Sequence, residues 1–146
     1  MITEHKIASV LGGQTSLGRK IKSTLDMDNL IREGFPYKVG NHVRGLLNLS
    51  LPLFAGLIEV SERTLARIRK SPNRRFSTIA SDRLYRLARI FSIACEVLED
   101  EERAKEWIRR PQFGLGENTP LDLLHTEAGA KEVEDLLWRI EYGVIS

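Results

Sequence analysis

The spacing of apolar residues is the feature that most constrains how this chain can fold. Apolar side chains recur every three or four residues along most of its length, and no stretch alternates as a strand does. The clearest case is residues 81–98, which we expect to form a helix that starts at Ser81–Asp82 and has one apolar face. Such a face has to be buried against other helices. The sequence therefore predicts an all-α fold.

Capping residues and prolines mark where further helices start, and glycines mark where several of them stop. We expect helices at about 24–33, 43–48, 51–58 and 61–70, and others that start at Asp100, Thr119 and Thr126. Residues 1–23 contain three glycines and show weak periodicity, so we expect a flexible or weakly ordered arm there. This gives three parts: the arm, a helical region over residues 24–98 and a second helical region over residues 99–146.

The composition excludes several classes of protein. The chain has 146 residues, of which 42% are hydrophobic, so wholesale disorder is not expected. Cys95 is the single cysteine, which excludes an internal disulfide and a cysteine-based zinc cluster. Apolar runs are too short to span a membrane, and the N-terminus has no signal-peptide core. We expect a soluble cytoplasmic protein with no membrane association.

The formal net charge of +2 hides two opposite segments. Residues 61–92 contain nine Lys and Arg against two acids, a net charge of +7. Residues 93–146 contain six basic residues against thirteen acids, a net charge of −7. A basic middle segment favours a polyanionic partner, and an acidic C-terminal third favours a different one.

Residues 51–70 have the pattern of a helix-turn-helix. Ala55 is the small residue at which the second helix packs closely, and Val60 fills the turn. Leu65 and Ile68 are the apolar anchors of the second helix. This second helix is therefore a candidate for the one that enters the major groove of DNA.

The outward face of that helix has the residue types that bind DNA. Arginine binds guanine edges in a bidentate manner, and Ser, Thr and Lys bind phosphates. The candidate DNA-binding residues are Ser61, Arg63, Thr64, Arg67, Arg69, Lys70 and Arg74. A helical hairpin with a solvated basic face explains the same pattern, so both interpretations stay open at this point.

One position departs from the helix-turn-helix pattern. The turn residue is usually glycine, because its backbone is left-handed, and here it is Glu59. A residue with a side chain at such a position costs on the order of 1 kcal/mol. Glu59 also puts a negative charge beside the proposed DNA surface.

No catalytic constellation or metal-ligand spacing is found in the sequence. The segment 13–20 nearly matches a phosphate-binding loop, but Arg19 and Lys20 stand where that loop needs Lys and then Ser or Thr. The three histidines are far apart in sequence. We therefore expect a protein that is not an enzyme, with no cofactor and no metal.

The C-terminal third contains the most specific motif. After a turn over residues 111–118 the sequence reads Thr-Pro-Leu-Asp-Leu-Leu at 119–124, Thr-Glu-Ala-Gly at 126–129 and Ile-Glu-Tyr-Gly at 140–143. This run resembles the C-terminal domain of the Xre antitoxins of RES–Xre toxin–antitoxin systems, also called the Xre/MbcA/ParS-like toxin-binding domain. The resemblance covers about residues 50–146, including the helix-turn-helix.

The resemblance implies an antitoxin of a type II toxin–antitoxin system with an Xre/Cro-like helix-turn-helix. Members of the family bind a RES-type toxin that degrades NAD⁺, and they cover its active site. They also bind their own operator and repress transcription, often as dimers or as toxin–antitoxin complexes. The implied partners are thus a RES-domain toxin, operator DNA and a second copy of the chain.

The end of the chain is the candidate toxin-binding site. Large apolar side chains gather at the C-terminus, where a free chain usually frays. We therefore expect this end to dock either onto the chain's own core or into a cleft of a partner. The residues that we expect to help fill the toxin's site are Trp138, Arg139, Glu141, Tyr142, Val144, Ile145 and Ser146.

Two other functions fit the same residues. One is a stand-alone transcriptional regulator whose C-terminal region serves only for dimerisation. The other is a protein-interaction module whose helix-turn-helix has lost DNA binding, an alternative to which Glu59 gives some weight.

Overall fold

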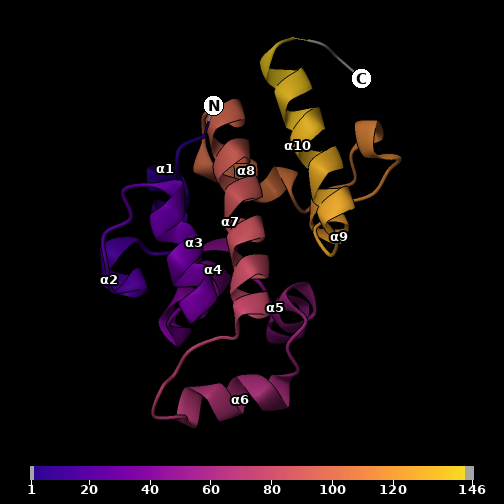
Figure 1. The fold of residues 1–146 in the computed structure, drawn as a ribbon. Coiled ribbons are helices and arrows are strands. Elements are labelled where there is room, and N and C mark those ends of the chain that lie inside the picture. Colours follow the sequence, from indigo (N-terminus) through magenta and orange to yellow (C-terminus); the bar gives the residue numbers. More distant parts are fainter. Residues whose placement is uncertain (1, 144–146) are drawn as a thin grey trace. The chain divides into compact units, whose positions relative to one another are not determined.

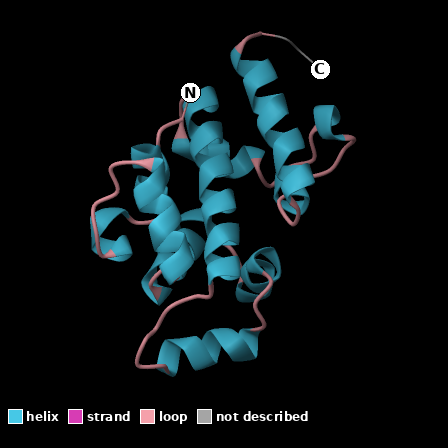
Figure 2. Cartoon of the chain, viewed as in Figure 1, coloured by secondary structure: helices cyan, strands magenta, loops and turns pink. Residues whose placement is uncertain are grey.

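The computed structural model describes residues 2–143, which contain helices and no strand (Figures 1 and 2). This confirms the predicted all-α fold. The elements in chain order are α1 (Glu4–Val10), α2 (Gly13–Leu17), α3 (Thr24–Glu33), α4 (Tyr37–Leu47), α5 (Leu51–Ile58), α6 (Glu62–Lys70), α7 (Thr78–Leu98), α8 (Glu101–Trp107), the 3-10 turn η1 (Phe113–Leu115), α9 (Pro120–Leu123) and α10 (Glu127–Glu141).

The chain divides into two compact units. The N-terminal unit comprises residues 3–88, and the C-terminal unit comprises residues 89–143 together with Ile2. We expected a division between residues 98 and 99, at the end of a helix. The structure divides inside α7 instead, between Ala88 and Arg89. One continuous helix thus contributes its first half to one core and its second half to the other.

Five predicted helix starts have the expected cap. Ser50, Ser61, Asp100, Thr119 and Thr126 each have an extended backbone, and each side chain accepts a hydrogen bond from the amide three residues later. These bonds satisfy amides that have no partner inside the helix. Local chemistry is therefore sufficient to start these helices.

The predicted start of the long helix at Ser81 is wrong. Helix α7 begins at Thr78, and the Ala80 amide donates a hydrogen bond to Ser77 Oγ at 3.1 Å. Ser81 is buried inside the helix, where its Oγ accepts a hydrogen bond from the Phe35 amide at 2.8 Å. The hydroxyl that the sequence marks as a cap thus satisfies a buried amide from a distant segment.

The prediction of a weakly ordered arm over residues 1–23 also differs from the structure. Helices α1 and α2 lie in this segment, and α2 packs on α4. Ile7, Leu11 and Leu17 are buried, and Tyr85 donates a hydrogen bond to the Glu4 carboxylate at 2.9 Å. Helices of seven and five residues are too short to show a clear period, so the sequence pattern did not reveal them.

The core of the N-terminal unit holds the helix-turn-helix in place. Val39, Val43 and Leu47 form the buried face of α4. They belong to the same core as the buried residues of α5, among them Phe54 and Ile58. Apolar burial of this kind stabilises a fold by about 25 cal/mol per Å² of area removed from water. Helices α5 and α6 are thereby fixed to a well-packed support.

The core of the C-terminal unit is built around α10. Val133, Leu136 and Leu137 are the buried face of this helix. Leu121 from α9 and Ile108, just after α8, are buried in the same unit. One side of α10 is thus used for packing, and the other side is available for contacts outside the unit.

Within residues 2–143, no helix combines the length and the apolar character that crossing a membrane requires.

Candidate functional site

Helices α5 and α6 and the three residues between them form the predicted helix-turn-helix, at the edge of the N-terminal unit (Figure 1). Glu59 has φ 56° and ψ 44°, the left-handed conformation expected for the turn. The Val60 amide then donates to the Ala55 carbonyl at 3.0 Å, and the side chain of Leu65 is 2% exposed. The small residue, the turn and the apolar anchor lie where the motif requires them.

The exposed face of α6 presents a cationic stripe. Arg63, Arg67 and Lys70 are exposed and follow one another at intervals of four and three residues, so they share one side of the helix. Arg69 is also exposed, but it lies two residues after Arg67, about 200° around the helix axis. The structure therefore groups three of the predicted basic residues of α6 and places Arg69 away from them.

Two of the candidate polar residues are engaged with each other. Ser61 Oγ accepts the Thr64 amide at 3.0 Å and is 2.9 Å from Thr64 Oγ1. Ser61 is exposed and Thr64 is half-buried. Both hydroxyls lie at the start of α6, and the established role of Ser61 is to cap this helix.

The negative charge of Glu59 has a partner. Its carboxylate forms an ion pair with Arg83 of α7, a residue of the same unit whose side chain is 25% exposed. A guanidinium next to a carboxylate partly cancels the electrostatic repulsion between that carboxylate and other anions. The expected repulsion between Glu59 and DNA is therefore weakened by a residue that lies 24 positions further along the chain.

The loop after α6 is fixed against the start of α4. The Arg74 carbonyl accepts the Tyr37 amide at 2.7 Å, and the Phe35 carbonyl accepts the Phe76 amide at 2.9 Å. A side chain at Gly34, whose φ is 95°, would overlap the Phe76 carbonyl oxygen. Arg74, the last candidate DNA-binding residue, is thus exposed on a loop whose backbone is held in place.

The C-terminal end of α10 presents an aromatic pair. The rings of Trp138 and Tyr142 stack with centroids 6.3 Å apart, and Trp138 Nε1 donates to Glu134 at 3.3 Å. Tyr142 is 74% exposed, and Ile140 and Glu141 are exposed beside it. The remaining candidate residues, Val144, Ile145 and Ser146, lie outside the residues that the structure describes.

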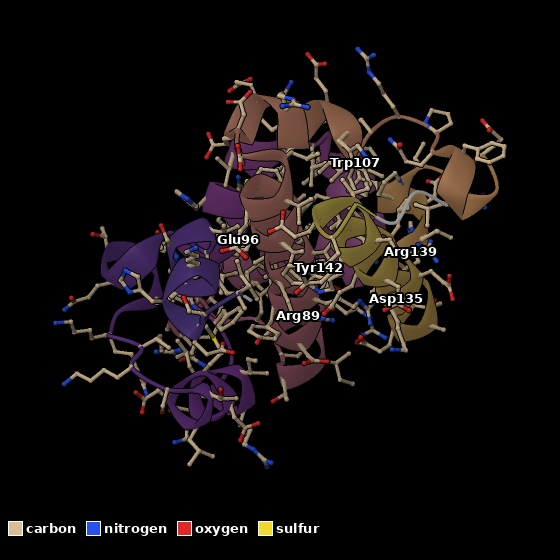
Figure 3. The ribbon with its side chains drawn as sticks, turned by 90° about the horizontal axis from the view of Figure 1, so that it is seen from above. Arg89, Glu96, Trp107, Asp135, Arg139 and Tyr142 are labelled. Atoms are coloured by element: carbon tan, nitrogen blue, oxygen red, sulfur yellow. The ribbon has the colours of Figure 1, made fainter. Side chains whose placement is uncertain are left out.

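Arg139 directly follows Trp138 on α10 and lies one turn after Asp135 (Figure 3). Its side chain is half-buried, and Nε has no hydrogen-bond acceptor within the described part of the chain. A buried donor without an acceptor costs free energy. Arg139 Nε is thus a buried donor whose hydrogen bond the described residues do not satisfy.

Helix α10 is clamped by an arginine that sequence analysis did not single out for this role. Arg89 forms ion pairs with both Glu127 and Glu134, and its side chain is 22% exposed. Because Glu134 also accepts the Trp138 indole, the clamp reaches the aromatic pair. No sequence signal marks Arg89 apart from the other basic residues of α7.

A second exposed aromatic residue was also missed. Phe113 is 81% exposed in η1, inside the segment that the sequence marks only as a boundary. The turn around it is tightly bonded, since the Gln112 amide donates to the Asn118 carbonyl and the Glu117 amide donates to the Gln112 carbonyl. Asn118 Nδ2 donates to the Leu115 carbonyl at 2.8 Å. The side chain of Phe113 is thus exposed to solvent on a turn that backbone and side-chain hydrogen bonds fix.

Two protein families match this chain in succession. Residues 26–89 match the antitoxin Xre-like helix-turn-helix domain. Residues 94–143 match the antitoxin Xre/MbcA/ParS C-terminal toxin-binding domain. The gap between the two matches lies in α7, close to the division between the compact units.

Three curated relatives are all named Antitoxin Xre. The protein of Photorhabdus laumondii is 32% identical over 130 residues, which cover 77% of this chain and 87% of the relative. That of Yersinia enterocolitica is 39% identical over 88 residues, 60% of this chain and 59% of the relative. That of Pseudomonas putida is 36% identical over 63 residues, 43% of this chain and 40% of the relative. The identity to the Photorhabdus laumondii protein, over most of both chains, shows that this chain belongs to the Xre antitoxins.

Proposed function

We propose that this antitoxin binds a RES-type toxin that degrades NAD⁺, occludes the toxin's active site and represses its own operon. The observation that carries the proposal is the division of binding surfaces between two compact units. The N-terminal unit presents the cationic stripe of α6, and the C-terminal unit presents exposed aromatic side chains. The chain acts by binding, and catalysis belongs to the toxin.

In the DNA-binding half of the proposal, α6 enters the major groove. Arg63 and Arg67 read base edges from the cationic stripe, and Lys70 and Arg74 bind phosphates. Thr64 adds a hydroxyl at the start of the helix. Ser61 contributes by capping α6, and Arg69 binds the flanking backbone from the other side of the helix.

In the toxin-binding half, the end of α10 fills the toxin's substrate site. Trp138 and Tyr142 are large and stack on each other, which suits an interface anchor. Arg139 directly follows Trp138, and its guanidinium binds an acceptor on the toxin that would otherwise hold substrate. Glu141 lies beside them, and the residues after Gly143 extend the same contact.

Phe113 is a second anchor on the same partner. It lies within the residues that match the toxin-binding domain, and its turn is ordered before any partner arrives. Ordering in advance lowers the entropy that binding costs. A shallow apolar pocket on the toxin is the complementary surface that this side chain requires.

Co-expression with the product of the neighbouring gene tests the proposal. We expect the two proteins to co-purify as a hetero-oligomer that contains two antitoxin chains, with the mass measured by light scattering. We expect the toxin alone to deplete cellular NAD⁺ and the complex to leave it intact. A neighbour that neither binds this chain nor consumes NAD⁺ contradicts the proposal and favours a regulator whose C-terminal unit serves for dimerisation.

A further inference from the structure

A pocket of about 360 Å³ lies in the N-terminal unit, between the first turn of α4 and the loop that follows α6. Three cationic side chains line it, together with two amides and the ring of Tyr37. The cations are Lys38, Arg74 and Arg75, and the amides are Asn41 and Asn73. None of the residues that line the pocket is an acid.

Two of the three cations in this pocket, Lys38 and Arg74, are available to a ligand. Lys38 and Arg74 are exposed, and neither forms an ion pair within residues 2–143. Arg75 Nη1 donates to the Gly34 carbonyl at 2.6 Å, which fixes the position of its guanidinium at the pocket wall. Glu33 is paired through both oxygens with Arg19, and this hydrogen bonding is the main cause that lowers the pKa of its carboxyl group; the charge of Arg75 lowers that pKa further.

The pocket is also built before a ligand arrives. Tyr37 stacks on Phe76 with centroids 5.5 Å apart, and its amide donates to the Arg74 carbonyl. Arg74 has φ 49°, a left-handed conformation that is unfavourable for a residue with a side chain. An arginine therefore occupies a position where glycine would be less strained, and strained backbone often accompanies function.

The chemistry of the lining identifies the ligand. Ammonium, guanidinium and amide N–H groups around one hollow are the donors that bind phosphate oxygens. Pro36, at the cap position of α4, offers no side-chain acceptor to the first turn, so the positive end of this helix also favours an anion. The loop that forms the pocket directly follows α6, the helix that we propose reads DNA. This position favours a phosphate of DNA over a free phosphate as the ligand.

We propose that this pocket binds a backbone phosphate of the DNA that α6 reads. The inference rests on the proposed function, because it requires the N-terminal unit to bind DNA. It extends the DNA-binding surface beyond the helix-turn-helix to α4, and it adds Lys38, Asn41 and Asn73 to the candidate residues. The pocket contributes to DNA affinity independently of base sequence, because every nucleotide has the same backbone phosphate.

Fluorescence anisotropy with the upstream DNA and with a scrambled duplex tests the proposal over a series of salt concentrations. The variants of the full chain are Lys38→Ala, Arg74→Gly and the double variant, and Lys22→Ala is a control for the loss of an exposed lysine elsewhere in the unit. Arg74→Gly removes the cation without adding backbone strain, since φ is positive there, and circular dichroism of each variant is the control for folding.

We expect the double variant to bind both duplexes about tenfold more weakly and to reduce the salt slope by about one, as the loss of one phosphate contact does. Lys22→Ala should bind as the unaltered chain does. Unchanged affinities and salt slopes in the pocket variants, with binding still weakened by Arg67→Glu, overturn the pocket proposal alone. Absence of DNA binding by the unaltered chain overturns both proposals.

A titration with inorganic phosphate separates the two sources of the ligand. We expect the amide signals of residues 37–41 and 73–75 to shift in NMR spectra with DNA at micromolar concentration. If they shift with millimolar inorganic phosphate while the pocket variants keep the DNA affinity of the unaltered chain, the pocket is a site for free phosphate and the proposal is wrong.

Discussion

Ser81 is fully buried, and its hydroxyl is the acceptor for the amide of Phe35, a residue 46 positions earlier in the chain. Ser81→Ala leaves that amide buried without a partner, which costs about 1–3 kcal/mol of unfolding free energy. Ser77→Ala removes the cap of α7 and costs about 1 kcal/mol. Urea unfolding followed by circular dichroism measures both. A larger effect at Ser77 than at Ser81 would contradict this assignment of roles.

Cys95 is half-buried, and removal from water, reinforced by the charge of Glu101, raises the pKa of its thiol to about 11. At pH 8 we expect a thiol-specific reagent to react about 100-fold more slowly than with the same chain in urea, because the thiolate is the reactive form. The folded state holds this proton more tightly, so its contribution to stability is present below pH 9 and is lost between pH 9 and about 11. Equal rates in the folded and unfolded chains would show that the site is not desolvated.

At the scale of the element, two helical glycines of similar appearance in the sequence have opposite roles. A side chain at Gly129 of α10 would overlap the backbone carbonyl of Leu123, whereas nothing lies within 4 Å of one at Gly45 of α4. We expect Gly129→Ala to destabilise the C-terminal unit by at least about 2 kcal/mol. We expect Gly45→Ala to stabilise the N-terminal unit by about 0.5–1 kcal/mol.

Thermal unfolding followed by circular dichroism measures the two glycine variants. A lower melting temperature for Gly129→Ala and a higher one for Gly45→Ala is the expected pair. Equal effects of either sign would mean that α10 does not pack on the Leu123 carbonyl as described. The close approach also explains why the Thr-Glu-Ala-Gly motif has a glycine where helix propensity favours alanine.

At the scale of the whole molecule, the two compact units predict that the two activities can be lost separately. Arg67→Glu reverses a charge on the exposed stripe of α6, so we expect operator affinity to fall by at least about tenfold and toxin neutralisation to persist. A chain truncated after Leu137 keeps the buried face of α10 and loses the aromatic pair. We therefore expect this chain to lose toxin neutralisation and to keep its affinity for the operator.

Gel shifts on the upstream DNA and growth rescue during toxin expression measure the two activities of these variants. Circular dichroism is the control for folding. Loss of both activities in either variant would indicate misfolding or coupling between the units. Neutralisation by the truncated chain would show that Trp138 and Tyr142 are not needed at the toxin.

Much of this molecule follows from local sequence. A helix starts where Ser50, Ser61 or Thr126 caps it, and these bonds span only three residues, so the sequence predicts them. The same holds for the turn at Glu59, whose left-handed backbone follows from its place after α5. The family motif could be identified from the sequence because its turns and helix caps depend on residues that are only a few positions apart.

Contacts between distant residues decided the rest. The burial of α1 and α2, the pairing of Glu59 with Arg83, the clamp of Arg89 on α10 and the pocket beside Arg74 each join segments that are far apart in the chain. The sequence by itself determined where most of the helices from α3 onward lie and which residues carry charge, but it did not reveal α1 and α2. Only the tertiary structure decided which charges are paired, which hydroxyls are buried and which aromatic rings face water, because these depend on packing and desolvation rather than on neighbours in sequence.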